Sequence, residues 1–321
     1  MLYMDPVNKF LDRVRSGRVC VGAQHSIMSP QIVEMYGWTG LDFVVIGTEV
    51  EAIDKSMIET LMRAANAARI VPIIKLAHPD PKLVSETLNW GANIVLCPHV
   101  TSAKQLDELV AASRFYPIGT RGECPVARYT QYGITPLDDS RDQANRATSI
   151  IPIIEDKEAL DNIEEIVANE HISLIEIGPF DFARSLETAL RGPVIWAAID
   201  KIVDAARAAG KHVMMPMWIT PELETAKAVM QHQIDHLISR GITVLFQPDV
   251  HVLANHYRNL TPMREITVRD EPDEPVAAEV PTATAKANGK ANGKAKPTAK
   301  ATTKKVRAGS ARAAKTTARR R

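Results

Sequence analysis

The chain has 321 residues, of which 45% are hydrophobic and 24% charged, and its formal net charge is +1. Residues 280–321 carry eight Lys and five Arg and no acidic residue, so 39 − 13 = 26 basic residues stand against 38 acidic residues before them, a net charge of −12. This length and apolar content suit one large domain or two ordinary ones, and an acidic body is joined to a tail with a charge of +13.

Secretion and membrane insertion are not indicated. No apolar run approaches the roughly 20 residues that a membrane-spanning helix needs, and the first residues, Met1-Leu-Tyr-Met-Asp-Pro, lack the basic and apolar regions of a signal peptide. Cys20, Cys97 and Cys124 are odd in number and share no metal-binding spacing, and Cys97 lies in an apolar run, typical of a buried free thiol. We therefore expect a cytoplasmic protein in a reducing compartment.

Short β-branched runs alternate with longer amphipathic segments along the body of the chain. The predicted strands are residues 19–24, 42–47, 71–76, 93–98, 150–154, 174–177, 212–217 and 243–247. The predicted helices are residues 54–69, 81–90, 102–114, 157–169, 194–209 and 221–240. Capping residues agree with these bounds: Asp54, Ser102 and Thr220 at N-caps, Pro221 at a first helical position, and Gly91, Gly210 and Gly241 after helix ends.

Eight strand–helix units predict a (β/α)8 TIM barrel over residues 1–265, since about 260 residues is the usual size of that fold. An open doubly wound sheet is the alternative, but it usually shows a Gly-rich phosphate turn after its first strand. Here the first strand ends with Gly22-Ala-Gln-His25, which lacks that pattern. The sequence therefore favours the barrel.

Residues 116–148 contain turn signals and charges but no convincing strand. Long ordered connections of this kind are usually active-site lids or oligomer contacts. The segment begins Pro117-Ile-Gly-Thr-Arg121, which predicts that Arg121 lies near the active site; a structural ion pair is the alternative.

Residues 266–321 change in character, from a Pro- and acid-rich stretch after Glu271 to repeats of Ala, Lys, Thr and Gly. Such a segment has little to bury, so we expect a disordered tail. Its composition resembles that of histone H1-like tails and predicts salt-sensitive, non-specific nucleic-acid binding without base recognition. A solvated polycation, or one that folds back on the acidic body, is the alternative.

Two carboxylates follow neighbouring predicted strands. Glu155 directly follows the strand 150–154, and Asp181 stands four residues after the strand 174–177. The carboxyl-terminal ends of barrel strands form one face, here called the rim, where active sites lie. Two hard oxygen ligands with open positions suit Mg²⁺ or Mn²⁺, although strand-end carboxylates also cap helices.

Further candidate residues stand at the other strand ends of the rim: His25, Glu49, Lys75, His99, Trp218, and Gln247 or Asp249. His99 and Glu49 are candidates for proton transfer, and His25 is a third. Lys75 could stabilise developing oxyanion charge or only balance the carboxylates. Trp218 could narrow a pocket or belong to the core.

Four motifs together resemble the HpcH/HpaI family of metal-dependent, class II pyruvate aldolases and lyases. They are Ile177-Gly-Pro-Phe-Asp181, Ile-Ile-Glu155, Pro98-His-Val100 and Tyr116-Pro-Ile-Gly-Thr-Arg-Gly122. The resemblance implies that Glu155 and Asp181 bind the metal, and that backbone N–H groups around Gly178, Phe180 and Asp181 contact the substrate carboxylate. It also implies a homo-oligomer, often a hexamer built from dimers, in which the two subunits of a dimer exchange a last helix around residues 251–259.

The chain departs from the family pattern at three places. The family's Asp-Gly-Glu-His, whose Asp and His handle protons, is Gly47-Thr48-Glu49-Val50; the family's Arg on the third strand is Lys75, and a frequent Gln is Ile153. Lys keeps the charge of Arg but loses its planar fork.

The expected function is a metal-dependent C–C lyase or aldolase for a pyruvate-like 2-oxo acid and an aldehyde or acyl partner.

Two alternatives remain. One is an altered barrel that acts as a binding or scaffold protein tethered to nucleic acid by its tail. The weaker one is a CoA-thioester lyase in which Lys75 or Arg121 would bind phosphates, although no phosphate-binding loop is evident.

Overall fold

A computed structural model describes residues 5–217 and 226–260 of the chain. Eight parallel strands hydrogen-bond in chain order, and β8 pairs with β1 to close a barrel. The predicted (β/α)8 TIM barrel is therefore confirmed. The strands are β1 Cys20–His25, β2 Phe43–Gly47, β3 Val71–Lys75, β4 Ile94–Cys97, β5 Ser149–Ile154, β6 Leu174–Ile177, β7 His212–Pro216 and β8 Ile242–Pro248. Every predicted strand boundary lies within one residue of these.

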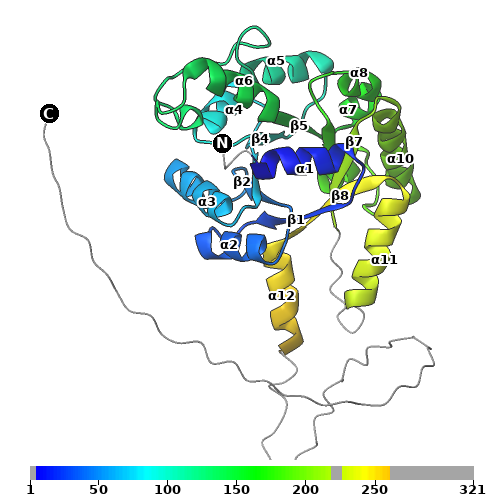
Figure 1. Ribbon diagram of the computed structural model, residues 1–321. Coiled ribbons are helices and arrows are strands. Elements are labelled where there is room, and N and C mark those ends of the chain that lie inside the picture. The colour runs from blue at the N-terminus through cyan, green and yellow to red at the C-terminus, as the bar shows by residue number, and fades with distance from the viewer. Residues whose placement is uncertain (1–4, 218–225, 261–321) are drawn as a thin grey trace, which may run out of the picture. The chain divides into compact units, whose positions relative to one another are not determined.

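Helices surround the barrel, as Figure 1 shows. They are α2 Pro30–Trp38, α3 Lys55–Ala67, α4 Pro81–Asn89, α5 Ala103–Ser113, α7 Lys157–Asp161, α8 Ile163–Val167, α9 Pro179–Ser185, α10 Pro193–Ala208 and α11 Ala226–Ser239. The predicted caps at Asp54 and Ser102 are confirmed, because their side chains accept hydrogen bonds from Met57 N and Gln105 N. The predicted cap at Thr220 lies outside the described residues.

The helix predicted over residues 157–169 is divided into α7 and α8 at Asn162. The Asn162 side chain donates a hydrogen bond of 2.9 Å to the carbonyl oxygen of Thr101, and its backbone is not helical (φ −103°, ψ 15°). An Asn side chain that bonds elsewhere competes with helix continuation. The hydrogen bond to Thr101, in the loop before α5, therefore fixes the position at which α7 ends and α8 begins.

An additional helix, α1 (Asp5–Arg15), closes the amino-terminal end of the barrel. It buries an apolar stripe of Val7, Phe10, Leu11 and Val14, which clusters with barrel residues such as Phe43. Apolar residues at these spacings form one face of a helix, so the pattern that marks α1 is present in the sequence although it was not predicted.

The segment 116–148 packs at this same end of the molecule, opposite the rim. It contains a short 3-10 helix, η1 (Arg128–Thr130), and α6 (Leu137–Ala147), and its Tyr129 and Ala144 cluster with α1. The interpretation of this segment as an active-site lid is therefore wrong, and its role as an oligomer contact stays a prediction.

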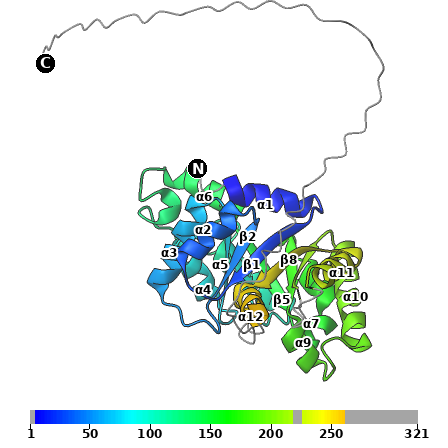
Figure 2. The ribbon, with the colours of Figure 1, turned by 90° about the horizontal axis from the view of Figure 1, so that it is seen from below.

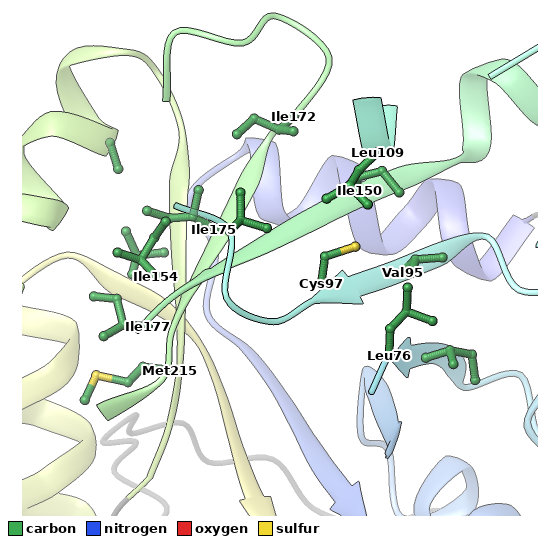
Figure 3. Close-up of a cluster of buried hydrophobic side chains, with 14 of the residues drawn as sticks. Leu76, Val95, Cys97, Leu109, Ile150, Ile154, Ile172, Ile175, Ile177 and Met215 are labelled. Atoms are coloured by element: carbon green, nitrogen blue, oxygen red, sulfur yellow. The ribbon is translucent and has the colours of Figure 1, made fainter. Parts of the chain in front are cut away.

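Strand alternation divides the core into two layers. On β5, Ile151 and Ile153 belong to the cluster inside the barrel, whereas Ile150 and Ile154 belong to the cluster between barrel and helices. Figure 3 shows part of this outer layer, including Ile150, Ile154 and Cys97. Each fully buried aliphatic side chain contributes about 1.5–3 kcal/mol. The same alternation directs Glu155, two residues after Ile153, toward the inside of the barrel.

The three cysteines are free. Cys97 is fully buried, as predicted, and burial raises the pKa of its thiol. Burial likewise raises the pKa of Cys20 to about 11. Both thiols are therefore in their protonated form at neutral pH.

The last described helix, α12 (Asp249–Leu260), leaves the barrel directly after β8 (Figures 1 and 2). Its Val252, Leu253 and Tyr257 are exposed apolar side chains. Its first residue, Asp249, is fixed against the end of β1 by a hydrogen bond from Ser26 N. The base of α12 is thus part of the rim.

The chain divides into two units, Met1–Thr267 and Val268–Arg321. The second unit lies outside the described residues, so the domain boundary at residue 265 and the disordered tail stay predictions. Within residues 5–217 and 226–260, no helix combines the length and apolarity required to cross a membrane.

Candidate active site

Glu155 lies on the rim. It directly follows β5, is 4% exposed, and accepts a hydrogen bond of 2.9 Å from the backbone N–H of His99. Burial raises the pKa of its carboxyl group, although the His99 N–H and the charge of Lys75 act in the opposite direction. Gly178 on the neighbouring strand end leaves room for this carboxylate, because a Cβ at position 178 would lie 2.3 Å from Glu155 Oε2.

Asp181 is the second predicted metal ligand, and it lies in the first turn of α9 with an exposed side chain. Its negative charge is close enough to Glu155 to raise the pKa of that carboxyl group. Among the residues that the structure describes, no three or more His, Cys, Asp or Glu side chains form a metal-binding group. The predicted ligands Glu155 and Asp181 offer the carboxylate oxygens that Mg²⁺ or Mn²⁺ prefers, and water or substrate oxygens would have to supply the other ligands.

Lys75 ends β3 and points into the barrel, in step with Val71 and Ile73 of the inner cluster. Its Nζ lies 2.6 Å from Glu49 Oε2. Burial acts to lower the pKa of Lys75, but the Glu49 contact and the charges of Glu176 and Glu155 outweigh it, so the net pKa is raised. The structure thus brings the predicted Glu49 and Lys75 together, and the amine is held as a cation.

Glu176 is a rim-side residue that the sequence analysis missed. It lies within β6, is 5% exposed, and faces the barrel interior in step with Leu174. Burial raises the pKa of Glu176 to about 8, and its Oε2 has no hydrogen-bond partner within the described structure. A lone acidic residue in the otherwise apolar strand Leu174–Ile177 is the signal that could have identified it.

Glu176 lies at the level of one expected departure from the family pattern. It pairs in register with Ile153, which stands where the family often has Gln. The polar group absent from β5 is therefore present on β6, at the same level of the barrel.

His99 stands beside Glu155 at the end of β4, with its backbone in the left-handed region (φ 49°). Its Nδ1 lies 3.0 Å from Asp156 Oδ2 and 3.6 Å from Glu155 Oε1. Burial acts to lower the pKa of the imidazole, but the neighbouring carboxylates outweigh it and the net pKa is raised. His99 is therefore better suited to carry a positive charge than to accept a proton. Asp156, its partner, was not singled out in the sequence.

His25 does not face the rim interior, so its selection as a base is wrong. Side chains alternate along β1, so His25, five residues after Cys20 of the inner cluster, points to the opposite side of the strand. It is fully buried there. Ser29 N–H donates to its Nε2 at 3.1 Å, and its Nδ1 lies 3.0 Å from Asp249 Oδ2. Tyr36 OH donates to the same Asp249 oxygen at 2.9 Å. Both ring nitrogens thus serve to tie α2, β1 and α12 together.

Arg121 is likewise not brought to the rim. Its guanidinium is buried over the rings of Phe115 and Tyr129, with distances of 4.5 and 5.1 Å to the ring centroids, and donates a 2.9 Å hydrogen bond to Asn89 Oδ1. Asn89 ends α4, the helix that leads into β4, so Arg121 lies at the amino-terminal end of the barrel. The prediction of a substrate-binding Arg121 is wrong because residues 116–148 pack at that end.

Of the two remaining predicted substrate-binding residues, the structure describes only Phe180. Phe180 is 56% exposed at the start of α9, next to Gly178 and Asp181. Trp218 lies outside the described residues.

Known proteins resemble this chain over most of the barrel. The chain is 27% identical over 206 residues to a 5-keto-4-deoxy-D-glucarate aldolase of Enterobacter sp. (strain 638), covering 64% of this chain and 80% of that protein. It is 29% identical over 207 residues to a 4-hydroxy-2-oxo-heptane-1,7-dioate aldolase of Salmonella dublin, covering 64% and 78%.

Among solved structures, the citrate synthase SbnG superposes with a TM-score of 0.68 at 27% identity, covering 79% of this chain and 96% of that one. A family protein from Burkholderia cenocepacia J2315 has a TM-score of 0.72 at 22% identity, covering 81% and 100%, and supports the fold alone.

Residues 25–237 match the family model described as HpcH/HpaI aldolase/citrate lyase. That range runs from the end of β1 into α11 and contains Lys75, Glu155 and Asp181. Since the match covers well over half of the chain and includes the rim carboxylates, this barrel belongs to the HpcH/HpaI aldolase/citrate lyase family.

Proposed function

We propose that the protein is a divalent-metal-dependent aldolase or lyase that makes or breaks a C–C bond next to the carbonyl of a pyruvate-like 2-oxo acid. The observation that carries the proposal is the pair Glu155 and Asp181 after neighbouring strands, with Gly178 leaving room for the Glu155 carboxylate. Mg²⁺ or Mn²⁺ would supply Lewis-acid stabilisation of the enolate that such reactions form.

The names of the relatives support the substrate class. One relative is a 5-keto-4-deoxy-D-glucarate aldolase and another a 4-hydroxy-2-oxo-heptane-1,7-dioate aldolase. By this similarity the chain would take a small 2-oxo acid together with an aldehyde. The similarity to the citrate synthase SbnG, at 27% identity, supports two further possibilities to the same extent: an acyl partner in place of the aldehyde, and a reaction that runs in the direction of condensation.

Lys75 would stabilise the negative charge that develops on the substrate's carbonyl oxygen. Its ion pair with Glu49 holds the amine at the rim, and its raised pKa keeps it positively charged. A preorganised cation at a buried site costs no reorganisation when the charge appears. Glu49 then acts through Lys75, as a residue that positions it.

His99 and the start of α9 would bind the substrate's anionic groups. The raised pKa of His99 favours its charged form, and its side chain is 46% exposed at the rim, accessible to a ligand. Phe180 and Asp181, in the first turn of α9, would present backbone N–H groups to a carboxylate, whereas the Gly178 N–H donates to the Ile154 carbonyl oxygen and Gly178 would contribute only space. Trp218, beyond β7, would complete the pocket.

The test is proton exchange at the methyl group of pyruvate, followed by NMR in D₂O with and without Mn²⁺ or Mg²⁺. Metal-dependent deuterium incorporation is expected for the full-length protein, and its loss in the Glu155→Gln/Asp181→Asn double variant. Exchange needs no second substrate, so it reports enolate formation alone. Metal binding without exchange would overturn the proposal.

A second candidate function is a binding or scaffold protein. Gly47 and Val50 favour it, because neither can transfer a proton at positions where the family has Asp and His. In that case residues 280–321 of the tail, with a charge of +13, would tether the barrel to nucleic acid in a salt-sensitive manner. Binding of duplex DNA by the full chain, lost on removal of residues 266–321, would support the tether.

We also infer a cytoplasmic homo-oligomer, with dimers or hexamers formed through α12. The exposed Val252, Leu253 and Tyr257 on this helix favour burial against another subunit. Light scattering of the full chain, with a Leu253→Glu/Tyr257→Glu variant, tests the assembly.

A further inference from the structure

Glu51 occupies the space that a side chain at position 47 would fill. A Cβ built on Gly47 would lie 2.2 Å from Glu51 Oε2 and 2.7 Å from Oε1. Real Cβ atoms do not approach other atoms this closely, so a side chain at position 47 would displace the flexible end of Glu51 from this place. The two positions form one unit, in which a carboxylate reaches back over the end of β2.

The direction of that carboxylate follows from the strand. Phe43 and Val45 of β2 belong to the cluster inside the barrel, and Gly47 continues the same alternation. The missing side chain of Gly47 would therefore point inward, and the Glu51 carboxylate lies over the mouth of the barrel.

The neighbouring strands fix this arrangement. Gly47 pairs in register with Lys75, and both the N–H and the hydroxyl of Thr48 donate to the Lys75 carbonyl oxygen, at 3.0 and 2.9 Å. From the β1 side, the Ser26 hydroxyl donates to Glu51 Oε1 at 3.3 Å. Glu51 therefore lies between the ends of β1 and β2, one strand from the Lys75 amine.

The donors to Glu51 are uncharged and distant: the Ser26 hydroxyl, and the Val50 N–H at 3.3 Å from Oε2. Glu49, in contrast, is ion-paired to Lys75 at 2.6 Å. His25 has both ring nitrogens bonded within the protein. A general base must reach the proton that it removes, and the half-buried Glu51 has no ion pair among its described contacts that would hold its carboxylate away from a substrate.

We propose that Glu51 is the catalytic base and acid of this site, an assignment that rests on the proposed function. Its carboxylate takes a proton from C3 of the 2-oxo acid as that C–H bond breaks. The electron pair forms the C2–C3 double bond, and the carbonyl electrons move to the oxygen that Lys75 faces. The resulting carboxylic acid returns the proton to C3 in the reverse step. The chain thereby has a proton-transfer group although Gly47 and Val50 have none.

The experiment compares two reactions of the full-length protein with Mn²⁺. Pyruvate methyl exchange requires a base, whereas decarboxylation of oxaloacetate forms the same enolate by losing CO₂ and requires none. Glu51→Gln should lower exchange by at least about 100-fold, the usual contribution of a general base, and leave decarboxylation near the wild-type rate. Glu108→Gln, an exposed glutamate on α5, is the matched control and should change neither.

Two further variants test the shared space. Gly47→Ala keeps Glu51 but displaces its carboxylate, so exchange should fall while decarboxylation persists. Gly47→Asp combined with Glu51→Ala returns a carboxylate to the same space and should recover part of the exchange lost in Glu51→Ala alone.

The outcomes separate the two proposals. Wild-type exchange that persists unchanged in Glu51→Gln overturns the assignment of Glu51 and leaves the proposed function standing. Equal loss of both reactions in Glu51→Gln means a structural role and also overturns the assignment. A wild-type protein that binds Mn²⁺ but does not catalyse exchange overturns the proposed function itself, whether or not it decarboxylates oxaloacetate.

Discussion

The His99 backbone N–H and the Glu155 carboxylate are joined by a hydrogen bond of 2.9 Å, while the imidazole of the same residue contacts Asp156 at 3.0 Å. The left-handed backbone of His99 (φ 49°) makes both contacts possible from one residue. Backbone and side chain thus make separable contacts: the amide donates to Glu155, and the imidazole, whose pKa is raised, contacts Asp156.

The variant His99→Asn separates these contacts, since Asn tolerates the left-handed region. Metal affinity should be unchanged, because the amide remains. KM for the 2-oxo acid should rise about tenfold, as expected for loss of one hydrogen bond to a charged group. The difference from wild type should shrink as the pH rises through the raised pKa of His99, where the imidazole loses its charge. A fall in Mn²⁺ affinity in a calorimetric titration would contradict this division.

The variant Gly178→Ala should weaken metal binding without touching a ligand. The new Cβ would lie 2.3 Å from Glu155 Oε2 and force that carboxylate to move. Residues that orient a metal ligand typically contribute about 10–100-fold in affinity. Gly122→Ala is the control, because a Cβ there has no atom within 4 Å. Equal Mn²⁺ affinities for the two variants would show that Glu155 does not bind the metal.

Replacing Lys75 should affect both stability and catalysis. Lys75→Met leaves Glu49, Glu176 and Glu155 without their shared cation, so the free energy of unfolding should fall by about 1–3 kcal/mol. Pyruvate exchange should fall by about 100-fold or more, the usual loss for an oxyanion-stabilising group. Urea denaturation and NMR exchange measure the two effects. Lys75→Arg should retain most of the stability, and full exchange in Lys75→Met would contradict the role proposed here.

Glu176 predicts a pH dependence of stability. Burial raises its pKa to about 8 from an ordinary 4.5. Below about pH 4.5 the group is protonated in both states, so the native state has its full stability relative to the unfolded state. As the pH rises to about 8, the unfolded chain releases this proton and the native protein does not, so stability is lost. The melting temperature of Glu176→Gln, measured in EDTA, should therefore rise relative to that of the wild type as the pH increases from 5 to 8. A constant difference across that range would contradict the buried protonated acid.

Arg121 should matter for folding and not for catalysis. Arg121→Met removes the contacts with Phe115, Tyr129 and Asn89, and we expect the free energy of unfolding to fall by about 1–3 kcal/mol. Metal affinity and kcat/KM should stay within about twofold of wild type, since the guanidinium lies at the end of the barrel opposite Glu155. A selective loss of kcat/KM would restore the substrate-binding interpretation.

The fold was predictable because buried parallel strands are continuous apolar runs. The run Ser149–Ile154 is fully buried, and Glu155 follows it as the first charged residue. The same contrast marks Lys75 after Val71-Pro-Ile-Ile. Helix α1 was missed although its apolar spacing is regular, and α6 was missed because its sequence, Leu137-Asp-Asp-Ser-Arg, is mostly polar.

The orientation of rim residues was harder to predict. Successive side chains of a strand point to opposite faces, so the exact position of a strand-end residue decides whether it faces into or out of the barrel. His25 and Lys75 both end strands, yet His25 packs outward against Tyr36 and Asp249, while Lys75 points inward. One residue of register decides this, and register is set by all eight strands together. Glu51 escaped notice for a related reason, since its carboxylate folds back over Gly47 from a loop.

By itself, the sequence determined the barrel, the order of its elements and the two carboxylates after β5 and β6, because apolar periodicity and strand-end polarity are local properties. Only the tertiary structure decided that Arg121 lies at the far end of the barrel, that Glu176 and Lys75 share the interior, and that Glu51 lies over its mouth. Those relations depend on barrel closure, which brings residues distant in sequence to one face and fixes the direction of every side chain there.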